Sequence, residues 1–75
     1  MIPFVTVRPL PSGWQVDAFG HEPVVFSSGA QAERAARRLA EALAERDGAA
    51  AVRIYLRDGA LGGRFLCSRE ALQPA

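Results

Sequence analysis

The chain has 75 residues, of which 49% are apolar, and its nine basic and eight acidic residues leave a net charge of +1. Fourteen of the apolar residues are alanine, so 23 larger apolar side chains remain for a core, enough for one small domain and too few for two. The near balance of charge argues against a strong nucleic-acid binder, which usually carries a large basic excess.

The first third of the chain predicts three short strands. Residues 2–8 alternate with period two, and Pro9 is expected to end this strand because proline has no amide proton to donate to a sheet. The turn signal at residues 11–13 leads into a second strand over residues 14–19, which we expect to form an antiparallel hairpin with the first. Residues 24–26 are expected to add a third strand.

A single long helix is predicted over residues 30–46, which contain no proline, glycine or β-branched residue. Ser28 and Gln31 have the spacing of a capping box, and Asp47-Gly48 is expected to end the helix. Apolar residues recur at three- and four-residue spacing and form a narrow stripe that we expect to lie close against a sheet. This stripe consists of Ala32, Ala36, Leu39, Ala40 and Leu43.

Two further strands are predicted after the helix. Residues 51–57 alternate strictly, and we expect Val52, Ile54 and Leu56 to face the helix. Asp58-Gly59 favours a two-residue hairpin turn, and residues 60–67 would then return as the fifth strand. Within that strand Gly62-Gly63 predicts a bulge or an early end.

The order β-β-β-α-β-β predicts an α+β fold, with a mainly antiparallel sheet and one long helix packed on one of its faces. We expect residues 1–75 to form a single domain, in which residues 68–75 are a C-terminal tail that has room for one helical turn over residues 68–73. No repeat or linker interrupts the sequence.

Patterns that indicate catalysis or a cofactor are lacking in the sequence. Cys67 is the only cysteine and His21 the only histidine, which excludes an intramolecular disulfide and is too few ligands for a structural zinc site. The glycine-rich residues 59–63 lack the lysine of a phosphate-binding loop, and no serine lies in a nucleophile-elbow pattern. We therefore expect a protein that is not an enzyme and binds no cofactor or metal.

The expected location is the bacterial cytoplasm, without a membrane partner. Residues 1–9 lack the basic start and the apolar core of a signal peptide. No apolar run approaches the roughly 20 residues that a membrane-spanning helix needs.

The sheet face turned away from the helix carries the most informative pattern, a mixture of aromatic residues and arginines. This candidate interaction face consists of Phe4, Arg8, Phe19, Arg53, Tyr55 and Arg57. Such side chains are enriched in protein interfaces, and they also suit stacking on single-stranded bases. A half-solvated sheet whose aromatic residues pack across strands would show the same pattern. Trp14, by contrast, is expected in the core.

From this pattern we expect a small, non-enzymatic interaction or accessory domain that binds a protein partner or itself. A homodimer is expected, because buried interface would supplement a thin core and an irregular fifth strand would leave a sheet edge unpaired. The alternative is a weak binder of single-stranded nucleic acid that uses the arginine and aromatic side chains of the sheet face.

The sequence also resembles the small bacterial family designated domain of unknown function 2188, over roughly residues 3–61. The resemblance rests on Val5-Thr6-Val7-Arg8-Pro9, Gly13-Trp14-Gln15-Val16, the Ala32 and Ala36 pair and Asp58-Gly59. It implies a compact sheet-plus-helix domain of unknown activity, so it assigns a functional role to no residue.

Overall fold

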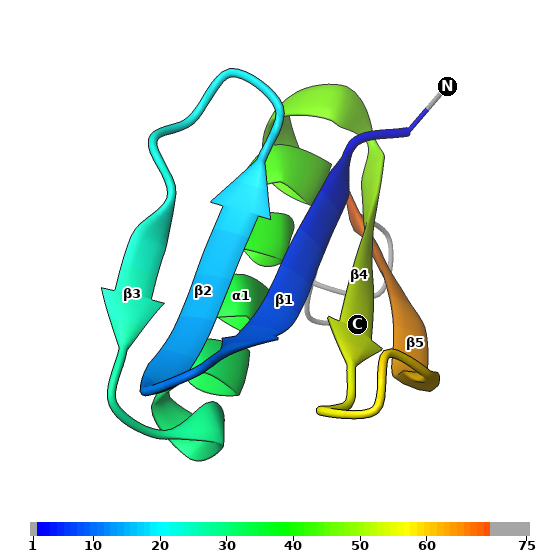
Figure 1. Cartoon of the computed structure of the whole chain (residues 1–75). Helices are drawn as coiled ribbons and strands as arrows, with labels where there is room; N and C mark the ends of the chain where they lie inside the picture. The colour runs from blue at the N-terminus through cyan, green and yellow to red at the C-terminus, as the bar shows by residue number, and fades with distance from the viewer. Residues whose placement is uncertain (1, 70–75) are drawn as a thin grey trace.

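Five strands and one helix make up the computed structural model, which describes residues 2–69. In chain order they are β1 (Phe4–Leu10), β2 (Gly13–Ala18), β3 (Val24–Phe26), α1 (Gly29–Asp47), β4 (Ala49–Tyr55) and β5 (Leu61–Ser68). The strands form one sheet in the order β3-β2-β1-β4-β5, and α1 covers one face of it (Figure 1). The predicted α+β class and element order are confirmed.

The connection through α1 decides which strands are central and which are edges. β1, β2 and β3 form an antiparallel meander, and β4 and β5 form an antiparallel hairpin. Because α1 carries the chain across the sheet between these two units, β4 returns parallel to β1, with Val5 opposite Val52. The three-residue β3 and the eight-residue β5 therefore lie at the two edges.

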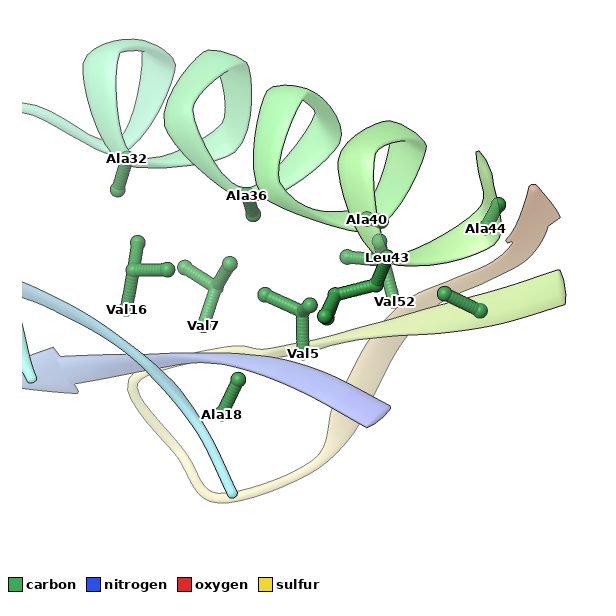
Figure 2. Packing of buried hydrophobic residues seen from close by; sticks show 11 residues of the cluster. Val5, Val7, Val16, Ala18, Ala32, Ala36, Ala40, Leu43, Ala44 and Val52 are labelled. Carbon is green, nitrogen blue, oxygen red and sulfur yellow. The ribbon is translucent and has the colours of Figure 1, made fainter. Parts of the chain in front are cut away.

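The core is a contact between alanines of α1 and valines of the sheet. Figure 2 shows the alanines of the helix pointing toward valines that rise from the strands. All of these side chains are buried, and the set consists of Ala32, Ala36, Ala40 and Ala44 on α1 and Val5, Val7, Val16 and Val52 on the strands. Leu43 completes the stripe as expected, whereas Leu39 is only partly buried beside the cluster. Trp14 also packs against the core, as predicted.

Both ends of α1 are capped by local contacts. The Ser28 hydroxyl accepts a hydrogen bond from the Gln31 amide at 3.1 Å, as the capping-box spacing predicts. The Gln31 side chain does not complete that box, because its Oε1 accepts from the Ser27 hydroxyl at 3.1 Å. At the other end Gly48 adopts a φ of 96° and donates its amide to the Ala44 carbonyl at 2.7 Å. A positive φ is accessible to glycine without a steric penalty, so the chain turns directly into β4.

Two predicted boundaries in the hairpin of β1 and β2 are wrong. β1 continues through Pro9, which lies opposite Trp14, and ends at Leu10. The imide nitrogen of Pro9 points toward the β4 side, where pairing already ends at Val7 and no donor is needed. β2 ends at Ala18, so Phe19 lies in the turn that follows.

The prediction for Leu56 is also wrong, because β4 ends at Tyr55 and Leu56 is 46% exposed instead of facing the helix. Residues 56–60 form a longer connection than the predicted two-residue turn. Among them only Gly59 has a positive φ, of 88°, whereas a type I′ turn requires two such residues. The Asp58 carboxylate stabilises the connection by accepting the Ala60 amide at 2.9 Å.

The expected irregularity in the fifth strand is confirmed as a register shift between Ile54 and Tyr55, opposite Gly62. A Cβ atom on Gly62 would lie only 2.5 Å from the Leu56 side chain, so a larger residue in this bulge would require Leu56 to move. β5 extends to Ser68, one residue into the predicted tail. The helical turn expected over residues 68–73 lies largely outside the described residues.

Enlarging a residue of the alanine stripe should destabilise the fold. Ala36 is fully buried against the sheet, so Ala36→Leu must displace the helix or distort its neighbours. We expect a loss of about 1–3 kcal/mol in the free energy of unfolding, measured by urea denaturation. Ala42→Leu, on the exposed side of α1, is the matched control and should change stability by less than about 0.5 kcal/mol. Equal effects of the two substitutions would contradict the close packing of Ala36 against the sheet.

Candidate interaction surface

The sheet face opposite α1 is not covered by any helix or strand of residues 2–69 (Figure 1). Strand alternation and register place one set of side chains on this face, which we call the outer face. The set includes Phe4, Thr6 and Arg8 from β1, Gln15 and Asp17 from β2, Val25 from β3, Arg53 and Tyr55 from β4, and Arg64 and Leu66 from β5. Four of the six predicted face residues are thus on the same surface.

An arginine stacked on an aromatic ring occupies the middle of the outer face. The guanidinium carbon of Arg53 lies 4.1 Å from the centroid of the Phe4 ring, a cation–π contact. Arg53 lies opposite Arg64 of β5, and repulsion between like charges favours a side chain turned toward β1. The Arg53 Nε atom is buried, and no acceptor among the described residues reaches it. Thr6 is buried beside this pair.

The charge of Arg8 is balanced within the outer face. Arg8 Nε donates to the Asp17 carboxylate at 3.2 Å across the β1–β2 pair, and the Gln15 amide donates to the same oxygen at 3.2 Å. Because this ion pair is largely exposed, it adds little stability, but it orients both side chains along the face.

The structure places Arg57 and Phe19 away from the middle of the face. Arg57 follows β4, donates to the Leu10 carbonyl at 2.7 Å and lies over the Trp14 ring at 4.9 Å. It therefore closes one end of the β1–β2 hairpin. Phe19 is fully exposed in the turn after β2, next to the hollow bordered by Phe4 and Arg8.

The edge strand β5 is the part of this surface that the sequence analysis missed. Leu66 is 62% exposed and Leu61 is 48% exposed, both large values for leucine. Arg64 is the only charged residue of the strand, and β5 has no proline or lysine to discourage pairing with another chain. Alternation over residues 64–68 could have placed Leu66 on the outer face. Gly62-Gly63 instead led to the expectation of a bulge or an early end of this strand.

On the helix side of β5, charged residues of α1 lie over the strand. The guanidinium of Arg37 lies 4.2 Å from the centroid of the Phe65 ring and 3.3 Å from the Glu33 carboxylate. Partial burial and the nearby Glu41 carboxylate raise the pKa of the Cys67 thiol, and the positive charge of Arg37 opposes this shift. Cys67 is consequently a weak nucleophile at neutral pH.

Neither a possible metal site nor a membrane-spanning helix is found among the described residues. Among residues 2–69 no three His, Cys, Asp or Glu side chains gather into a possible metal site. Within the same residues, no helix has the length and apolarity needed to cross a membrane. His21 is exposed in the turn before β3.

Comparison of the chain with protein-family models, with curated proteins and with solved structures found no match. The resemblance to the domain of unknown function 2188 family therefore stays a prediction.

The electrostatic setting of Cys67 can be tested by the pH dependence of its alkylation. A raised pKa leaves less thiolate at a given pH, so iodoacetamide should react more slowly with the folded protein than with the urea-unfolded chain. Glu41→Gln removes the negative charge, lowers the pKa and should speed alkylation near pH ~8. Arg37→Gln should slow it. A rate–pH profile that neither substitution moves would contradict this account.

Proposed function

We propose that the chain is a small, non-enzymatic interaction domain that binds protein, either a partner or itself, through β5 and the adjoining outer face. The observation that carries the proposal is the exposed edge of β5. An eight-residue strand borders the sheet, and its Leu66 side chain is 62% exposed. Edge strands with unpaired backbone groups accept a further strand, which is a common mode of protein recognition.

The alternation of hydrogen-bonded and non-bonded pairs along β4 and β5 shows which backbone groups of β5 point away from β4. The Arg69 amide donates to the Gly48 carbonyl at 2.9 Å, and bonded and non-bonded pairs alternate along an antiparallel ladder. Phe65 and Cys67 therefore bond toward β4, whereas Arg64 and Leu66 direct their amide and carbonyl groups outward. These outward groups would pair with an added strand.

The two sheet edges differ in what they offer to a partner. β3 has only three residues, and short edge strands are a recognised protection against pairing. β5 is more than twice as long, and its outward backbone groups belong to residues whose side chains lie on the outer face. A strand added at β5 would thus extend the outer face, which carries partly exposed aromatic and arginine side chains of the kind found in interfaces.

Binding of single-stranded nucleic acid has less support from the geometry. Stacking on bases requires free aromatic faces beside uncommitted cations. One face of Phe4 is occupied by Arg53, Arg8 is paired with Asp17, and Arg57 lies over Trp14. Of the predicted face residues, Tyr55 and Phe19 take part in none of these contacts.

The proposed function predicts protein adducts at the β5 edge in cells. A photoreactive phenylalanine derivative in place of Leu66 should yield specific cross-linked products, identified by mass spectrometry. The same derivative in place of Ala42, on the exposed side of α1, is the control and should yield only background. A product of twice the subunit mass indicates self-association, and another mass indicates a different protein. Equal, weak labelling at both positions would refute the proposed function.

The nucleic-acid alternative is tested by titration with a fluorescent mixed-sequence single strand. We expect no saturable binding at ~50 mM salt, where phosphate contacts are strongest. If binding did occur, counterion release would weaken it steeply as salt increases. Binding that Arg53→Glu and Tyr55→Ala each reduce would favour this alternative over the proposed function.

A further inference from the structure

We infer that the occupant of the β5 edge is β5 of a second copy of this chain, paired antiparallel about a two-fold axis at Leu66. This inference rests on the proposed function and names its partner. The two sheets would join into a continuous ten-stranded sheet, with one α1 from each copy on the same face. Two-fold pairing places identical surfaces against each other, so the register must make β5 complementary to itself.

The hydrogen-bond phase restricts the registers that two β5 strands can adopt. Residues that point outward must lie opposite one another, and in β5 these include Arg64 and Leu66. Between residues 63 and 68, where β5 pairs without interruption, the two-fold axis can then pass through Arg64, Phe65, Leu66 or Cys67. An axis at Cys67 would bring the two Glu41 carboxylates, which lie near the Cys67 thiols, against each other. Each choice brings a different pair of side chains together.

Charge distinguishes the registers. An axis at Arg64 places two arginines directly opposite each other, which is unfavourable. An axis at Phe65 places the two Phe65 rings opposite each other, and with them the two Arg37 guanidinium groups that stack on those rings. An axis at Leu66 places two exposed leucines together, and neither repulsion arises.

The axis at Leu66 also brings opposite charges on the two α1 helices together. In this register Phe65 lies opposite Cys67 of the second copy. Arg37 lies over Phe65, and Glu41, one helical turn further along α1, is close enough to Cys67 to perturb its thiol. Arg37 of each copy therefore faces Glu41 of the other, and the two-fold axis generates this pair twice. Opposite charges at matching positions favour the encounter and fix the register.

The first experiment measures the subunit mass of the full chain by analytical ultracentrifugation over a wide concentration range. We expect a concentration-dependent dimer for the natural sequence. Leu66→Lys places two ammonium groups together and should raise the dissociation constant by more than about a hundredfold. Val25→Lys is the matched control, because Val25 is 60% exposed on the other edge strand, and it should leave the dimer unchanged.

The second experiment tests the register by reversing charge. Arg37→Glu and Glu41→Arg should each raise the dissociation constant, by about tenfold, because each creates a like-charge pair across the axis. The double variant with both substitutions should restore dimerisation. Both positions are exposed on α1, and circular dichroism is the check that each variant folds. Single variants that dimerise normally would overturn the proposed register.

A third experiment locates the axis by oxidative cross-linking in a Cys67→Ser background. Leu66→Cys should form an intermolecular disulfide, since opposed residues of an antiparallel pair have Cα atoms about 5.5 Å apart. Arg64→Cys should not. Cross-linking of Arg64→Cys alone, or only of a mixture of the two variants, would place the axis at Arg64 or Phe65 and overturn the inference.

The outcomes separate failure of this inference from failure of the proposed function. A monomer mass that persists to about 1 mM overturns the pairing of two copies. If the photoreactive group at residue 66 nevertheless labels a different protein, the interaction domain stands and only the identity of its partner was wrong. A monomer mass that persists, together with no labelling at residue 66, would overturn both this inference and the proposed function.

Discussion

The close contact between α1 and the sheet is the constraint on which the rest of this structure depends. Ala32, Ala36, Ala40 and Ala44 present only methyl groups, so the helix can lie near the strands while the valines of the sheet fill the space between. Packing at this density gains dispersion energy from many short contacts, and it leaves no space for a larger residue. A chain with 23 large apolar side chains can stabilise one such layer contact, and here it lies on a single side of the sheet.

The outer face follows from this one-sided packing. Its central strands are shielded by their own side chains, because Arg53 stacks on Phe4 and Arg8 pairs with Asp17. The side chains in the middle of the face are engaged in these contacts and are therefore less available to a ligand. Among residues 2–69, β5 pairs with a strand on one side only, so its outward backbone groups are not shielded in this way by another strand. Both proposals therefore place binding at the edge and give the face a supporting role.

Much of the candidate surface could be predicted from alternation alone. Period two placed Phe4, Arg8, Arg53 and Tyr55 on one face, and the structure confirms their common side. Alternation does not extend past the end of a strand, which is why Phe19 and Arg57 were assigned to this face although each lies beyond its strand. Leu66 was missed for a different reason. Its exposure depends on β5 being an edge, and this depends on the sheet order.

The sequence by itself determined the elements that local chemistry specifies. Helix propensity, the Ser28 cap and the Gly48 stop define α1, and alternating apolar residues define which side of each central strand is buried. Only the tertiary structure decided the parallel pairing of β1 with β4, the five-residue connection before β5 and the position of β5 at the border. These features depend on contacts between residues far apart in the chain, and a strand's own sequence does not encode which neighbour it will meet or whether it will have one.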